Sequence, residues 1–197
     1  RLRDDSTASK DVVVESFRPG TLERWGLDYE RLGEGHPGLV LLRISGFGQS
    51  GPYRDRPSYE PVASAMGGLT YLCGFPDEPP VRPGLALSDY LAGTFGALGI
   101  LAALYHRDRS GEGQWIDLAL YEPLLRFSHQ NIPAFDKLGE VKERTGNRSH
   151  PRGMGVAPAG LFETRDGRWV VALAPEDKDF GRLCRAMGKE ELASDPR

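Results

Sequence analysis

Asp89 stands where a carboxylate could act as a nucleophile. Ser88 has the residue type of a helix N-cap, so Asp89 falls in the first turn of a predicted apolar helix, Ser88–Arg107. The positive end of the helix dipole and the free N–H groups favour the ionised carboxylate, which is the reactive form. The same pattern also fits an aspartate that only caps the helix.

Three further segments carry groups that could surround a substrate. Phe17 and Arg18 follow a short apolar run. They could stack on a base and pair with phosphate, or be a packed ring beside a surface arginine. The glycine loop Gly46–Gly51 could offer backbone N–H groups to an oxyanion, or be a plain turn. Tyr59 and Glu60 open a predicted helix, where a hydroxyl and a carboxylate would be useful beside an acyl group.

An alternation of strand and helix patterns must position these segments. Apolar runs predict buried strands at Asp11–Glu15, Leu39–Ile44 and Gln114–Leu120. Between them, helices are expected from Thr21, as N-cap, to about Leu32, and over Tyr59–Leu72. The order predicts an α/β fold with a Rossmann-like parallel sheet. In the helix after Ser88, glycines recur at every third position and predict close packing: Gly93, Gly96 and Gly99.

A shift in composition near Lys137 divides the chain. Residues 1–136 are expected to form part of a large α/β domain. Residues 137–160 are polar and rich in Gly, Pro and Arg, which predicts a linker or loop. Residues 161–197 are expected to begin a smaller α+β domain, with a hairpin turn at Arg165-Asp166-Gly167 and a helix after Pro175.

Composition excludes several classes of function. The 197 residues carry a net charge of −3, whereas a general nucleic-acid binder is usually basic. The longest apolar stretch, Leu98–Tyr105, is too short to span a bilayer, so no membrane partner is expected. Cys73 and Cys184 have no metal-ligand spacing, which predicts no metal and fits a reducing cytoplasm. No signal peptide is visible and the chain starts without Met, so a fragment is expected.

Six blocks, in order, resemble the family III CoA-transferases, which include formyl-CoA transferase, carnitine CoA-transferase and α-methylacyl-CoA racemase. The resemblance covers almost the whole chain from Asp11. The blocks are DVVVESFRPG at 11–20, LVLLRISGFGQSGPY at 39–53, SYEPVASAMGGL at 58–69, SDYLAG at 88–93, ILAALYHRDRSGEGQWIDLALYE at 100–122 and TGNRS at 145–149.

The resemblance implies roles for particular residues. Asp89 matches the aspartate that forms the acyl-enzyme. Residues that match the CoA-lining segment and a basic contact on the next helix are Ser16, Phe17, Arg18 and Arg24. Tyr59 and Glu60 match the pair that faces the acyl group in transferases. The segment Ser149–Gly155 falls where formyl-CoA transferase has a loop that covers the active site.

Two departures from the family pattern bear on the activity. Ser16 replaces a frequent Asn, so that contact changes, and the covering loop here has fewer glycines.

Racemases of the family carry a His-Asp pair at the Tyr59-Glu60 position, and this chain lacks that His. Because racemisation needs an acid and a base on opposite faces of the α-carbon, the resemblance implies a transferase above a racemase.

The expected activity is therefore transfer of coenzyme A from an acyl-CoA to a small carboxylic acid through an aspartyl acyl-enzyme. Coenzyme A enters as a substrate, with no permanently bound cofactor. The resemblance also implies an interlocked homodimer for the full-length protein. An acyl-CoA racemase or epimerase, and a non-catalytic CoA-binding remnant, remain alternatives.

Overall fold

The computed structural model describes residues 11–148 and 158–195, which fall into two compact units. The first unit comprises Arg1–Thr70 and Arg82–Glu140, and the second comprises Tyr71–Val81 and Val141–Arg197, within the described residues. The chain thus joins the second unit briefly at Tyr71–Val81 before it returns, an excursion that the sequence pattern does not predict. The predicted covering loop, Ser149–Gly155, lies outside the described residues.

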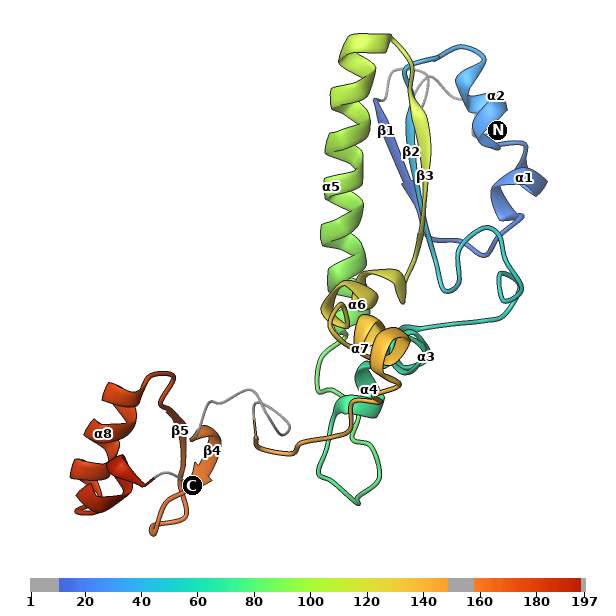
Figure 1. The fold of residues 1–197 in the computed structure, drawn as a ribbon. Coiled ribbons are helices and arrows are strands. Elements are labelled where there is room, and N and C mark those ends of the chain that lie inside the picture. Colours follow the sequence, from blue (N-terminus) through green and yellow to red (C-terminus); the bar gives the residue numbers. More distant parts are fainter. Residues whose placement is uncertain (1–10, 149–157, 196–197) are drawn as a thin grey trace. The chain divides into compact units, whose positions relative to one another are not determined.

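A three-stranded parallel sheet forms the centre of the first unit (Figure 1). Its strands lie in the order β1 (Val12–Glu15), β2 (Val40–Ser45) and β3 (Gln114–Ala119). The central strand supplies a run of buried aliphatic side chains, as expected for a strand covered on both faces. All three strands were predicted within one residue at either end, and the α/β fold class is confirmed.

Helices cover both faces of this sheet (Figure 1). The long helix α5 (Leu87–Ser110) packs on one face, where Leu42 of β2 points towards it. The next residue, Arg43, points to the opposite face and pairs with Glu23 of α1 (Thr21–Trp25). This alternation follows from the two-residue period of a strand.

Two helices predicted as continuous are each divided in the structure. The first is split into α1 and α2 (Tyr29–Gly33), because Gly26 ends α1 in the left-handed region at φ 68°. Asp28, not Thr21, is a side-chain N-cap, and it accepts the Arg31 N–H at 3.0 Å. The second is split into α3 (Glu60–Met66) and α4 (Leu69–Leu72), with Gly68 between them at φ 81°. A left-handed glycine is a common way to end a helix.

The glycines of α5 differ in what they pack against. A Cβ at Gly96 would lie 2.7 Å from Leu42 Cδ2, and one at Gly99 would lie 3.5 Å from Ile116 Cδ1. A Cβ at Gly93 would meet nothing within 4 Å. Close packing is therefore confirmed for two of the three glycines. Among the described helices, α5 alone is long and apolar enough to cross a membrane, yet it packs against β2 and β3.

The remaining elements follow β3. The first unit ends with α6 (Glu122–Phe127) and α7 (Asn131–Leu138). The second unit contains the antiparallel strands β4 (Ala159–Glu163) and β5 (Trp169–Leu173), then α8 (Asp177–Ala186) and the 3₁₀ helix η1 (Glu190–Ser194). The predicted hairpin and the helix after it are confirmed.

Candidate functional site

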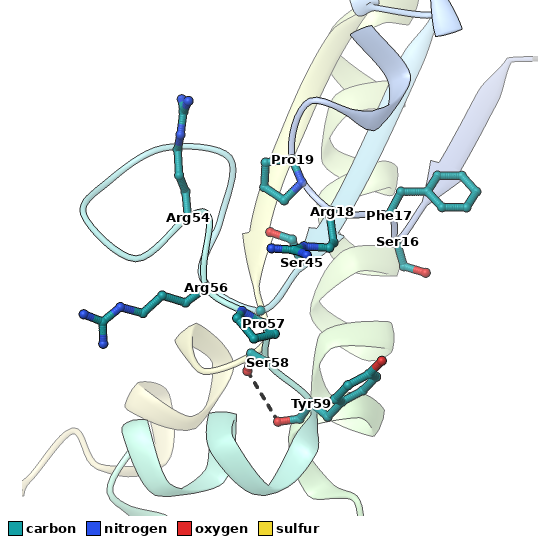
Figure 2. Close-up of a pocket in the computed structure, with 11 residues that line it drawn as sticks. Ser16, Phe17, Arg18, Pro19, Ser45, Arg54, Arg56, Pro57, Ser58 and Tyr59 are labelled. Atoms are coloured by element: carbon teal, nitrogen blue, oxygen red, sulfur yellow. Dashed lines mark hydrogen bonds between the residues drawn. The ribbon is translucent and has the colours of Figure 1, made fainter. Parts of the chain in front are cut away.

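A pocket of about 140 Å³ lies at the carboxyl ends of β1 and β2 (Figure 2). Ligands of open parallel sheets bind at this edge, because the loops that follow the strands meet there. Three predicted CoA-site residues, Ser16, Phe17 and Arg18, line the pocket together with Tyr59. The other lining residues are Pro19, Ser45, Gly46, Arg54, Arg56, Pro57 and Ser58. Segments far apart in sequence therefore meet in one place.

A buried ion pair holds the segment that follows β1. Glu15 Oε1 accepts from Arg43 Nε at 2.7 Å, and both side chains are almost fully buried. The other oxygen of Glu15 accepts the backbone N–H of Phe17 at 2.7 Å. One carboxylate therefore fixes the strand and the start of the pocket wall. The sequence did not predict this role of Glu15 and Arg43. A charged residue inside an apolar run does not show by its local pattern whether it forms a buried ion pair.

Three arginines give the pocket a positive character. Arg18 crosses to the opposite wall, where its Nη2 donates to the backbone oxygen of Asp55 at 2.8 Å. Arg56 lies over the Tyr53 ring, 4.2 Å from its centroid, and Arg54 makes a weak contact of 3.5 Å with Asp55. Within the described residues, neither Arg18 nor Arg56 has a carboxylate partner. Guanidinium groups are strong donors to phosphate and carboxylate oxygens, so this wall suits an anionic ligand.

A residue of the pocket wall, Ser45, carries a buried hydroxyl. Ser45 is 7% exposed, and its Oγ has no hydrogen-bond partner among the described residues. Next to it, a Cβ at Gly46 would overlap Ser58, so only glycine allows this close approach of the two walls. The structure changes one expectation for the glycine loop: the Gln49 N–H is already bound to Asp117, at 2.9 and 3.0 Å, and is not available to an oxyanion.

Tyr59 and Glu60 are adjacent in sequence but face different surroundings. Tyr59 lines the pocket and is 79% exposed. Glu60 is 5% exposed; it accepts from Ser64 Oγ at 2.5 Å and from Arg82 Nη2 at 3.0 Å. Arg82 was not among the predicted residues, and its place in a Pro- and Gly-rich segment gave no sign of this contact.

Asp89 lies in the first turn of α5, as predicted, but the local details differ. The N-cap position is Ala86, and Ser88 is instead buried inside the helix, with no partner for its Oγ among the described residues. The pKa of Asp89 is raised above its usual 3.8, first by desolvation and then by the negative charge of Glu60. Both influences oppose the effect that was predicted from the helix end, which favours the ionised form.

Arg24 does not line the pocket. It lies on α1, where its Nη2 donates to Thr21 Oγ1 at 3.0 Å. In the described part of the chain, no three His, Cys, Asp or Glu side chains are placed to hold a metal ion. Cys73 and Cys184 are both free thiols.

The parallel sheet and the cationic pocket at its carboxyl edge together define the candidate site of an α/β protein. The chain belongs to CoA-transferase family III, whose model matches residues 7–197. It is 49% identical over 187 residues to succinyl-CoA–D-citramalate CoA-transferase of Chloroflexus aurantiacus, which covers 95% of this chain and 46% of that protein. The beta subunit of succinyl-CoA–L-malate CoA-transferase from the same organism is 47% identical, covering 98% and 47%.

Solved structures show the same fold. A CaiB/BaiF family protein from Brucella suis matches with a TM-score of 0.83 and 36% identity, over 97% of this chain and 49% of that one. A protein from Mycobacterium tuberculosis matches with a TM-score of 0.81 and 29% identity, over 97% and 49%. The chain spans about half the length of the curated relatives it matches.

Proposed function

We propose that the full-length protein transfers coenzyme A from an acyl-CoA to a carboxylic acid, with Asp89 as the nucleophile. One observation carries the proposal. The residues that match the family's CoA segment, Ser16 to Arg18, line a cationic pocket in the same unit as Asp89. In that unit α3, which begins beside the pocket residue Tyr59, packs against α5, which carries Asp89.

The proposed reaction proceeds through three covalent intermediates on Asp89. A carboxylate oxygen attacks the thioester carbonyl, the C–S bond breaks, and CoA thiolate leaves a mixed anhydride behind. The thiolate attacks the Asp89 carbonyl and releases the donor acid, which gives an aspartyl-CoA thioester. The acceptor carboxylate attacks this thioester, the C–S bond breaks, and CoA thiolate leaves a second mixed anhydride behind. The thiolate then attacks the acceptor carbonyl of this anhydride, which gives the new acyl-CoA and releases the Asp89 carboxylate. Asp89 is regenerated, and the exchange is divided into easier steps.

The proposed substrates are short dicarboxylic acids. Several relatives are named for them: citramalate and malate in Chloroflexus aurantiacus, mesaconate in Haloarcula and oxalate in Acetobacter aceti. Succinyl-CoA is the donor in the names of three of these. We take succinyl-CoA as the donor to test first, against a panel of small diacids and monoacids.

The test is a transfer assay on the full-length protein that compares wild type with Asp89→Ala. Without the attacking carboxylate, transfer should fall by at least about a thousandfold. Asp108→Ala is the matched control, because Asp108 lies at the other end of α5 and pairs there with Arg107. In the wild type, mass spectrometry after acyl-CoA and hydroxylamine should mark Asp89.

Full activity in Asp89→Ala would disprove this mechanism. If no acid accepts CoA, exchange of the substrate α-proton with deuterated water would instead show that the protein is an acyl-CoA racemase or epimerase. Binding of CoA without either reaction would show that the protein is a non-catalytic CoA-binding remnant.

The proposal includes the organisation expected from the resemblance. The full-length protein is a cytoplasmic homodimer, in which the large domain ends at residue 136 and the small domain begins at residue 161. Gel filtration with light scattering of the full-length protein tests the dimer.

A further inference from the structure

The carboxylate of Glu60 is buried at the start of α3 and held at both oxygens. Ser64, one turn later, donates to Oε1, and Arg82 reaches Oε2 from the segment before α5. The two partners differ, because Ser64 is fully buried, whereas the Arg82 side chain is 63% exposed. Arg82 is the cation that pairs with Glu60 in the described residues.

Several charged side chains lie on the elements that pack against α5. They are Glu60 on α3, Arg43 on β2, Asp117 on β3, and Glu122 and Arg126 on α6. Arg43 is bound by two glutamates, Asp117 by the Gln49 N–H, and Glu122 by the Ala119 N–H. Of all these groups, Glu60 is the one whose charge raises the pKa of Asp89.

We infer that Arg82 is a positioning residue for the reaction. It holds Glu60 in place and offsets its negative charge, so that Asp89 is an anion at the pH at which transfer occurs. The inference rests on the proposed role of Asp89. Two neighbouring carboxylates oppose each other's ionisation, and a guanidinium on one of them relieves the other. Because Arg82 is largely exposed, its ion pair adds little to folding stability, so a catalytic effect is separable from unfolding.

The direction of the effect follows from the exposure of Arg82. When a neutral side chain replaces it, the Glu60 carboxylate loses the cation that pairs with it in the described residues, while its hydrogen bond from Ser64 remains. The uncompensated charge then disfavours the Asp89 anion. Transfer in Arg82→Gln should therefore be lost at a higher pH than in the wild type.

The experiment measures kcat/KM for succinyl-CoA against pH in the full-length wild type, Arg82→Gln, Arg82→Lys and Glu60→Gln. In Arg82→Gln, the acid limb, which is the fall of kcat/KM at low pH, should lie roughly half a pH unit higher than in the wild type. At pH values below the limb, this shift lowers kcat/KM by about threefold. Arg82→Lys should restore the wild-type profile, and Glu60→Gln should move the limb down. Arg182→Gln is the control, because Arg182 is an exposed arginine that pairs with Asp179 in the second unit.

A profile of Arg82→Gln that superimposes on the wild type, or lies at lower pH, overturns the inference. Hydroxylamine trapping in the wild type separates this result from failure of the proposed function. If the label is on Asp89 and the Arg82→Gln limb does not move, only the role of Arg82 is wrong. If the wild type carries no label on Asp89, the proposed nucleophile is wrong and the role of Arg82 falls with it.

Discussion

At the scale of single residues, two buried carboxylates near the pocket are each held by an arginine. Glu15 forms a salt bridge with Arg43 and accepts the Phe17 N–H, while Glu60 forms a salt bridge with Arg82. Both carboxylates lie within a few residues of the pocket wall. Arginines that pair with buried carboxylates therefore support the site at two places, although neither pair was visible as a local motif.

The Glu15 contact gives a prediction with an internal control. Glu15→Gln removes the buried charge that Arg43 faces and weakens the acceptor for the Phe17 N–H. We expect KM for acyl-CoA to rise about threefold to tenfold, kcat to change little, and stability to fall by about 1–3 kcal/mol. Steady-state kinetics and urea unfolding measure the two effects.

Glu23→Gln is the control for this change. Glu23 pairs with the same Arg43, but its side chain is 44% exposed. In the described residues, the Phe17 N–H donates to Glu15 and not to Glu23. Its stability loss should stay below about 1 kcal/mol, with KM unchanged. Equal KM effects in the two variants would contradict a specific role for Glu15.

At the scale of elements, helix α5 joins the core to the proposed nucleophile. Its middle rests on Leu42 and Ile116 through glycines, and its first turn presents Asp89. Because the helix is one continuous rod, its contact with the sheet fixes where Asp89 lies relative to the strand ends.

This contact predicts opposite effects for two substitutions on the same helix. Gly96→Ala places a methyl group 2.7 Å from Leu42 Cδ2, and should lower the free energy of unfolding by about 1–3 kcal/mol. Gly93→Ala meets open space, and should raise it by about 0.5–1 kcal/mol through better helix propensity. Thermal or urea unfolding of the two variants decides. Similar shifts of the same sign would contradict the packing described here.

At the scale of the whole molecule, local charge differs from net charge. The protein carries −3 overall, yet Arg18, Arg54 and Arg56 gather at one pocket. A local positive field can attract an anionic ligand to an acidic protein, and salt screens that field.

Acyl-CoA binding should therefore depend on ionic strength. We expect KM for acyl-CoA to rise several-fold between about 0.05 and about 0.5 M salt in the wild type, since exposed charges are screened over this range. The double variant Arg54→Gln with Arg56→Gln should start from a higher KM and show a weaker dependence. Arg168→Gln with Arg182→Gln, in the second unit, is the matched control. An equal salt dependence in both double variants would show that Arg54 and Arg56 do not create the field.

The sequence by itself determined the strands, the α/β class, the family and the position of Asp89 in a first helical turn. These follow from local periodicity and from ordered motifs, which need no knowledge of distant contacts. It also indicated Ser16 to Arg18 as a binding segment, and these residues do share a pocket.

Only the tertiary structure decided which side chains meet. Arg54 and Arg56 reach the pocket, and Arg82 reaches Glu60, through loops whose course no periodic pattern specifies. The desolvation of Asp89 and the charge of Glu60, which raise the pKa of Asp89, could not be predicted, because they depend on packing between α3 and α5. A helix dipole can be inferred from a few neighbouring residues, but burial and a facing charge require the folded chain.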